Sequence, residues 1–190
     1  MPTLLGLRVR VWAASDMVLD NDDQRDLSRE RMTNLFFTAR RPHNVGDILG
    51  GGNFGRGYDQ YLLDTGTSGG AESGWRLASE MIVETVRLAR YPTMPSRLTC
   101  SYAYPNEQVA RSAMTGSQVP LYLYEVESVD PSKPCYTLSR DLMSAANRMP
   151  RGVPFVPHVR SVADQYWSSK GGAYPEVITE SPLRVVRYLP

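Results

Sequence analysis

Short segments in which apolar and polar residues alternate recur along this chain, and they restrict its fold to one built on β-sheets. Residues 3–14 and 119–127 alternate with a period of two, as a strand with one buried face does. Other short runs rich in apolar and β-branched residues predict further strands at 35–40, 97–104, 176–179 and 183–189. The last two are two strands or one bulged strand, because Ser181 and Pro182 separate them.

Helical periodicity is clearest between Trp75 and Arg90, where apolar residues recur three and four positions apart. Glu80, Glu84 and Arg87 fall between them, so we expect these charges on the outer side of the helix. Asn106 can cap a helix that runs to Met114. We also expect a helix at 139–149 and one at 161–168, no regular structure in the proline-rich stretch between them, and a solvated helix or exposed loop at 20–31.

A glycine-rich stretch extends from Gly46 to Gly74 and supports no packed helix. It lacks the Gly-Lys-Ser/Thr ending of a phosphate-binding loop. We therefore predict a long mobile loop, and a loop of this length is typical of a binding loop or a lid. The elements together predict an α+β fold with mostly antiparallel strands in one domain that spans residues 1–190.

Composition excludes several classes of protein. Hydrophobic residues make up 42% of the 190 residues, which is enough to form a core and excludes a wholly disordered chain. The net charge of +1 argues against a nucleic-acid-binding protein that works by bulk charge. Arg8 and Arg10 stand where a signal peptide would be apolar, and no apolar run is long enough for a membrane helix. We therefore expect a soluble, cytoplasmic protein without a secretion signal.

The cysteines and histidines do not predict a metal site. Cys100, Cys135, His43 and His158 share no metal-ligand spacing, so we expect no bound metal. Cys100 could form a nucleophilic pair with a histidine, but nothing nearby would lower its pKa, and a buried inert thiol fits the pattern better.

Two groups of residues could carry chemistry. Glu176 opens an apolar strand after a glycine-containing approach, a position suited to a catalytic carboxylate or to a charge that prevents pairing at a sheet edge. Aromatic residues could stack on a base or a nicotinamide ring, or they could simply pack the core and the sheets. They are Tyr102, Tyr104, Tyr122, Tyr124, Tyr166 and Trp167.

Three segments together resemble one enzyme superfamily: FFTARRPHNVGDILGGGNFG, then RLTCSYAYPNEQVARSA with VPLYLYEVES, and AYPEVITESPLRVVRYL. They are similar to the ADP-ribosyltransferase superfamily, and most closely to a bacterial and phage group related to the rifampin ADP-ribosyltransferases. This resemblance implies two small antiparallel sheets that form an NAD cleft, with flanking helices. It also implies a glycosyltransferase that uses NAD as a substrate.

The resemblance implies catalytic or NAD-binding roles for individual residues. Glu176 matches the catalytic glutamate, and Arg40, at the end of the first core strand, matches an arginine that binds the dinucleotide. Thr99, Cys100 and Ser101 stand where the toxin-like branch has Ser-Thr-Ser. The resemblance therefore implies that Ser101 takes part in catalysis, by bonding the ribose or ordering the carboxylate, and that Thr99 contacts NAD.

Three aromatic residues complete the expected NAD site, and two of them depart from the family pattern. Tyr102 supplies an aromatic face. Phe37 stands where the rifampin-type enzymes have a histidine, and Tyr174 stands where many toxins have Gln or Glu, two residues before the catalytic glutamate. The Tyr174 position bears on the choice of acceptor.

The resemblance predicts a mono-ADP-ribosyltransferase that modifies a protein, a nucleic acid or a small molecule. The altered residues Phe37 and Tyr174 leave a second hypothesis open: a non-catalytic module with this fold that serves binding, phage virion assembly or another complex. A third hypothesis is an NAD glycohydrolase, which would release free ADP-ribose without an acceptor.

Overall fold

The computed structural model of the protein describes residues 34–52, 55–56, 68–115, 117, 119–168 and 174–190. The elements predicted at 3–14 and 20–31 lie outside these residues. In chain order the named elements are β1 (Leu35–Ala39), β2 (Ile48–Leu49), α2 (Ser68–Arg90), β3 (Ser101–Ala103), α3 (Glu107–Met114), β4 (Tyr122–Ser128), β5 (Cys135–Ser139), the 3₁₀ helix η1 (Arg140–Met143), α4 (Ala145–Arg148), α5 (Phe155–Trp167), β6 (Pro175–Thr179) and β7 (Leu183–Leu189).

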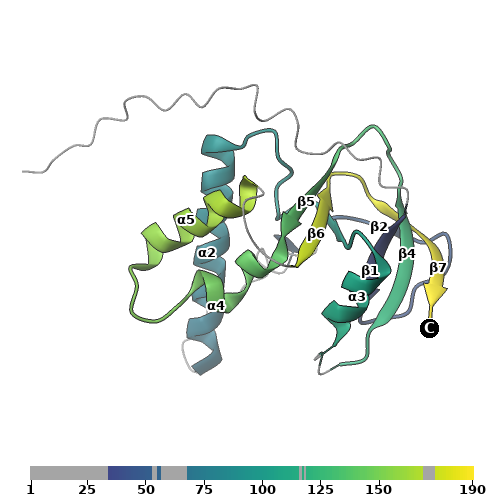
Figure 1. Ribbon diagram of the computed structural model, residues 1–190, viewed down its shortest axis with the longest axis horizontal. Helices are drawn as coiled ribbons and strands as arrows, with labels where there is room; N and C mark the ends of the chain where they lie inside the picture. The colour runs from purple at the N-terminus through teal and green to yellow at the C-terminus, as the bar shows by residue number, and fades with distance from the viewer. Residues whose placement is uncertain (1–33, 53–54, 57–67, 116, 118, 169–173) are drawn as a thin grey trace, which may run out of the picture.

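The strands form two antiparallel sheets, which confirms the predicted α+β class. One sheet has four strands in the order β1-β4-β7-β2, and the other has three in the order β3-β6-β5. The two C-terminal segments are separate strands in different sheets, with Ser181 and Pro182 between them. Figure 1 shows α2, α4 and α5 gathered on one side of the molecule, and α3 beside the four-stranded sheet.

Two apolar clusters form the core. The larger one joins α2 and α5 to the three-stranded sheet and contains the fully buried side chains of Tyr166, Trp167 and Ile178. The smaller one joins the two sheets to each other through residues such as Leu35 and Val177. Burial of large apolar side chains of this kind is the main favourable contribution to folding.

Helix α3 forms as its sequence predicts. The side-chain oxygen of Asn106 accepts a hydrogen bond of 2.9 Å from the backbone N–H of Val109, which satisfies one of the free donors of the first turn. Ala110 faces inward and is fully buried, while Arg111 is exposed and forms an ion pair with Glu107, one turn earlier.

The helix predicted from Trp75 is confirmed, but its charged residues do not all face solvent. Glu80 is 1% exposed and Arg87 is 8% exposed, so their predicted position on the outer side is wrong. Both have polar partners in the structure. Arg87 pairs with Glu84 at 2.7 Å and donates to the carbonyl of Met94. A charge in a protein interior requires such partners.

Two predicted boundaries on the N-terminal side are wrong. The stretch from Gly46 to Gly74, predicted as one loop, contains β2, and its last residues form the start of α2. The strand predicted at 97–104 is limited to Ser101–Ala103, because the chain turns before it: the N–H of Cys100 donates to the carbonyl of Ser96. The Gly-rich composition gave no signal for the elements within 46–74, and the apolar run at 97–104 gave no signal for the turn before β3.

The helical region between β5 and β6 also differs from the prediction. The single helix predicted at 139–149 is divided into η1 and α4, which meet at Ser144, and β5 precedes them as a strand that was not predicted. Helix α5 begins at Phe155, so Pro157 lies in its first turn rather than outside the helix. Proline is tolerated there because the N–H groups of a first turn have no intrahelical acceptor.

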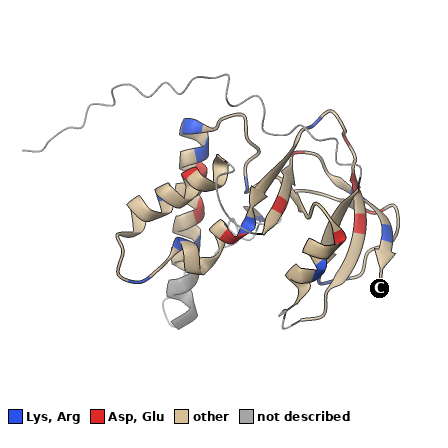
Figure 2. Ribbon diagram, viewed as in Figure 1, with Lys and Arg blue, Asp and Glu red and all other residues tan. Residues whose placement is uncertain are grey.

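Charges are distributed over the whole structure. Figure 2 shows basic and acidic residues interspersed along helices and strands. Within the described part of the chain, no helix combines the length and the apolar character that crossing a bilayer requires.

Candidate functional site

The two sheets are joined edge to edge, which gives them a common face. Phe36 of β1 and Tyr104, just after β3, form an antiparallel bridge in which each N–H donates to the other carbonyl, at 2.9 and 2.7 Å. Directly opposed residues point to the same side of a sheet, and alternate residues of a strand share a side. Phe36, Tyr104, Tyr102 and Glu176 therefore lie on one face, since Tyr102 opposes Ile178 and Glu176 is two residues from Ile178.

Glu176 is an acidic group on this face, which Glu125 of β4 shares because it opposes Phe36, and the Glu176 carboxylate is anchored through one oxygen. Oε1 accepts hydrogen bonds from Nη1 of Arg97 at 3.0 Å and from the hydroxyl of Tyr166 at 2.8 Å. Arg97 also donates to the Tyr166 hydroxyl at 2.7 Å, which closes a triangle. No residue in the described part of the chain donates a hydrogen bond to Oε2 of Glu176. One oxygen is thus fixed, and the other remains able to accept a bond.

A buried ionic network extends from this triangle into the helices. Nε of Arg97 lies 3.2 Å from Oε2 of Glu80, and Nη1 of Arg148 lies 2.6 Å from Oε1 of the same glutamate. The four charged side chains are at most 9% exposed. Two arginines and two glutamates balance in charge, which is how a cluster of buried charges is tolerated.

The electrostatics of the network keep Arg97 charged and its tyrosine neighbours neutral. Burial alone would lower the pKa of Arg97, but Tyr166, Tyr102, Glu80 and Glu176 outweigh burial, and the pKa lies well above its usual value. Burial raises the pKa of Tyr166 and of Tyr102 well above the usual value, against the opposing effect of Arg97. Tyr166 therefore keeps its proton and donates a hydrogen bond to Glu176.

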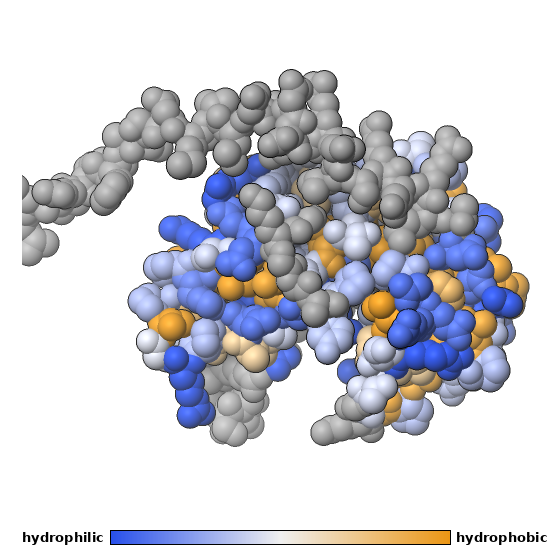
Figure 3. Space-filling model, in the orientation of Figure 1, coloured by the Kyte–Doolittle hydropathy of each residue, from blue (hydrophilic) through white to orange (hydrophobic). Residues whose placement is uncertain are grey.

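A second cluster forms the rim of the site. The register of β3 and β6, continued by one residue, places Tyr104 opposite Glu176. Arg140 donates from Nη1 to the hydroxyl of Tyr104 at 3.1 Å, and its backbone N–H donates to the carbonyl of Tyr174 at 2.8 Å. Arg140 is exposed, and Tyr174 is 59% exposed. Tyr104 precedes α3 and Arg140 leads to α4, and Figure 3 shows the surface notched between the α3 side and the α4 side.

The structure brings together some of the residues predicted from the sequence. Glu176 and Tyr102 share the face described above, and Tyr174 lies at its rim. Arg40 is exposed and directly follows β1, so it belongs to the other sheet and does not contact Glu176. Thr99 is exposed, and its carbonyl lies against Gly51 of the glycine-rich stretch.

Ser101 and Phe37 point to the opposite face. Cys100 and Tyr102, on either side of Ser101, pack in the helical cluster, so Ser101 points away from Glu176; its buried Oγ has no partner among the described residues. Phe37 packs against the cluster between the sheets, with its ring 6.5 Å from that of His43. The structure does not bring these two side chains to the carboxylate.

Sequence reasoning missed the partners that hold Glu176. Arg97 follows a proline-containing turn, and Glu80 and Arg148 lie on helices where charged residues are ordinarily solvated. In the sequence Tyr166 has only the signal of an aromatic residue that stacks or packs. Nothing in the local sequence distinguishes these four side chains, because their pairing depends on contacts between distant segments.

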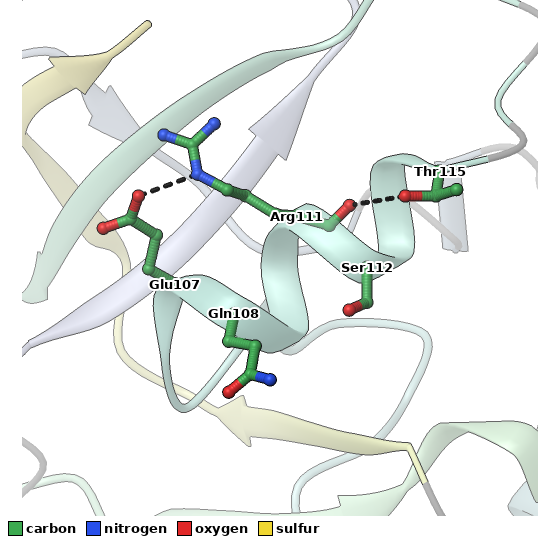
Figure 4. Close-up of a pocket in the computed structure, with 5 residues that line it drawn as sticks. All are labelled: Glu107, Gln108, Arg111, Ser112 and Thr115. Carbon is green, nitrogen blue, oxygen red and sulfur yellow. Dashed lines mark hydrogen bonds and ion pairs between the residues drawn. The ribbon is translucent and has the colours of Figure 1, made fainter.

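Two further features of the described residues add no chemistry to this site. A hollow of about 540 Å³ lies along the exposed side of α3, where Glu107 and Arg111 pair with each other and Thr115 donates to the carbonyl of Arg111 (Figure 4). These groups are mutually satisfied. Within the residues that the structure describes, no group of three or more His, Cys, Asp or Glu side chains is arranged to hold a metal ion.

The fold and site define an α+β domain with a buried, charge-balanced network beneath a partly free carboxylate. The family model described as "Protein of unknown function (DUF2441)" matches residues 63–189, more than half of the chain. The protein therefore belongs to the DUF2441 family. A comparison with curated proteins finds no match.

Proposed function

We propose that the protein is an NAD-dependent ADP-ribosyltransferase in which Glu176 is the catalytic carboxylate. The observation that carries this proposal is the difference in hydrogen bonding between the two oxygens of Glu176. Oε1 is held by Arg97 and Tyr166, and Oε2 accepts no hydrogen bond from a described residue. A preorganised carboxylate with one free oxygen is what stabilisation of a developing positive charge requires.

The proposed reaction breaks the bond between the ribose C1′ and the nicotinamide nitrogen. The bond's electron pair leaves with nicotinamide, which departs neutral, and positive charge develops on the ribose. Oε2 of Glu176 accepts a hydrogen bond from a ribose hydroxyl and stabilises this charge. A nucleophile of the acceptor then attacks C1′ and loses its proton to solvent.

The rim residues support the binding of a dinucleotide. Arg140 offers an exposed guanidinium, a group that binds diphosphate oxygens well, and its position is fixed by Tyr104. Tyr102 and Tyr104 offer aromatic rings on the same face. Arg40 stays in the proposal as a second diphosphate contact, whereas Ser101 and Phe37, which face the other side, are given no contact with NAD.

A second candidate is a non-catalytic binding module with the same architecture. The specific observation in its favour is the ion pair of Glu176 with Arg97, because a neighbouring cation reduces the negative charge that a carboxylate can offer to a cationic transition state. This candidate predicts that NAD or an assembly partner binds without turnover. The NAD glycohydrolase hypothesis differs from the first proposal only in using water as the acceptor.

The test is incubation of the protein with NAD labelled in its adenylate half and a cell lysate, with the label then sorted among protein, nucleic acid and free ADP-ribose. Transfer of label to a macromolecule is expected. Free ADP-ribose alone would assign the glycohydrolase, and intact NAD would favour the binding module.

The matched variants are Glu176→Gln and Glu127→Gln. Glu176→Gln is expected to lower NAD turnover by about 100-fold or more, because it removes the charge that stabilises the transition state. Glu127 lies on β4, in the other sheet, with its side chain 45% exposed and paired with Arg184, so the same change there should leave turnover unaltered. Equal turnover by the two variants would contradict the role of Glu176.

A further inference from the structure

A separate hollow of about 200 Å³ lies where α2, α4 and α5 meet. Trp75 of α2, Arg148 at the end of α4 and Phe155 at the start of α5 line it, together with residues of the segment between the last two helices, which include Met149, Arg151 and Val153. It is distinct from the rim of Arg140 and Tyr174.

The guanidinium of Arg148 is only partly satisfied. Nη1 donates to Oγ of Ser79 at 2.9 Å and to Glu80 at 2.6 Å. Nε is buried and has no acceptor among the described residues. The hydrogen bonds that the side chain donates to described residues both leave from Nη1, so Nη2 has no part in them. The residue itself is only 6% exposed. A buried N–H without an acceptor is unfavourable, so this edge of the guanidinium favours a ligand that supplies one.

The Nε–Nη2 edge of an arginine matches a carboxylate, because its two parallel N–H groups can bind both oxygens. The other residues of the hollow suit the rest of an anionic ligand. Trp75 is 55% exposed and meets the ring of Phe155 edge-on, with centroids 4.9 Å apart, so much of the indole remains uncovered. The described lining includes the exposed Arg151 and no Asp or Glu.

We propose that this hollow is a binding site for a small aromatic carboxylate. The carboxylate binds the Nε–Nη2 edge of Arg148, and the ring lies against Trp75. The volume limits the ligand to about one ring with its substituent, since pockets for larger ligands begin at roughly 300 Å³.

The probe is benzoate, with benzamide as its uncharged equivalent and inorganic phosphate as an anion without a ring. Binding to the intact protein is followed by saturation-transfer NMR of the two ring compounds and by the shift of the Trp75 indole N–H in ¹⁵N-labelled protein. Benzoate is expected to bind about tenfold or more tightly than benzamide or phosphate, because only benzoate has both the charge and the ring. Equal binding of benzoate and benzamide, or tighter binding of phosphate, would overturn the proposal.

Three variants locate the site. Arg148→Lys keeps the charge but removes the fork, and Trp75→Ala removes the ring surface; each should weaken benzoate binding about tenfold. Arg160→Lys, at an exposed position of α5, should leave binding unchanged. Arg148 is buried, so the result for Arg148→Lys counts only if this variant has the same midpoint of thermal unfolding as the native protein. If it does not, Trp75→Ala, which changes an exposed residue, is the deciding variant. Unaltered benzoate binding by Trp75→Ala would refute the site.

Discussion

Nη1 of Arg97 lies 3.0 Å from Oε1 of Glu176, and the two side chains are 4% and 9% exposed. Neither charge has access to enough water to be stable alone. Each residue of the pair therefore depends on the other, and Glu176 owes the fixed position of its carboxylate to an arginine 79 positions away in the chain.

The double substitution in this pair should destabilise the protein less than the sum of the two single substitutions. Glu176→Leu deprives the buried Arg97 of one of its two carboxylate partners, and Arg97→Met leaves the buried Glu176 without a cation. Each loss costs about 3–5 kcal/mol. The double variant leaves neither charge of the pair, so its loss should fall at least about 1 kcal/mol below the sum of the single losses. The measurement is the free energy of unfolding in urea for the four proteins.

Arg97 also contacts Glu80, which keeps Arg148 as a partner in every variant. A sum of single losses equal to the double loss would mean that Arg97 and Glu176 do not interact energetically. Arg97 would then not be the group that positions the carboxylate.

The glycine-rich stretch makes a different prediction, because two of its glycines lie directly against another backbone. A Cβ on Gly51 would lie 2.3 Å from the carbonyl oxygen of Thr99, and the backbone there cannot move aside without disturbing the turn before β3. Gly51→Ala should therefore destabilise the protein by about 2 kcal/mol or more. The midpoint of thermal unfolding is the measurement.

Gly50→Ala is the matched control. A Cβ on Gly50 meets nothing within 4 Å, so this change should be neutral or slightly stabilising through the unfolded chain, by up to about 1 kcal/mol. Similar losses for both variants would show that the close approach at Gly51 does not determine the effect.

Several elements were predictable because their signals are local. The cap of α3 depends on Asn106 and a first-turn amide three residues later, and Leu35–Ala39 is a short apolar run stopped by two arginines and a proline. The start of α2 at Ser68 was not predictable in this way. Glycines in its first turns have poor helix propensity, and the helix is held by the packing of its later turns against α5.

The candidate site was predictable only in part. Glu176 follows a local rule, a carboxylate at the start of an apolar strand, and its place on the sheet agrees with that rule. Its partners do not follow one: Glu80 has the spacing of a solvated helical charge but is buried, because Arg97 and Arg148 reach it from other segments. The side of the sheet to which each side chain points was also unpredictable. Ser101 and Glu176 point apart because of the register between β3 and β6, which the sequence alone does not specify.

The cap of α3 gives a smaller, local prediction. Asn106→Ala removes the acceptor for the Val109 amide and should lower the free energy of unfolding by about 1 kcal/mol. Ser112→Ala, at an exposed position of the same helix, changes no bond of the cap and should have little effect. The two variants are compared by urea unfolding, and an equal response would indicate that the hydrogen bond of Asn106 contributes nothing measurable.

The buried thiol of Cys100 should make the free energy of unfolding depend on pH in the alkaline range. Burial raises its pKa from 9.0 to about 12, against smaller opposing effects of Tyr102 and Arg97. A pKa raised by folding contributes stability that is fully present below the unfolded value and is lost as pH rises toward the folded value. Between pH 9 and 12 the unfolded thiol is ionised while the folded thiol keeps its proton, so unfolding releases a proton and becomes more favourable by about 1.4 kcal/mol per pH unit.

The measurement compares the native protein with Cys100→Ala between pH 8 and 10.5 in a reducing buffer. Tyrosine ionisation occurs in both proteins and cancels in the difference of their unfolding free energies, so the native protein should lose the additional stability only above pH 9. The same burial predicts that iodoacetamide at pH 8 labels the half-buried Cys135 well before Cys100. A pH-independent difference between the two proteins, or equal labelling of the two thiols, would mean that Cys100 is accessible to solvent in the folded state.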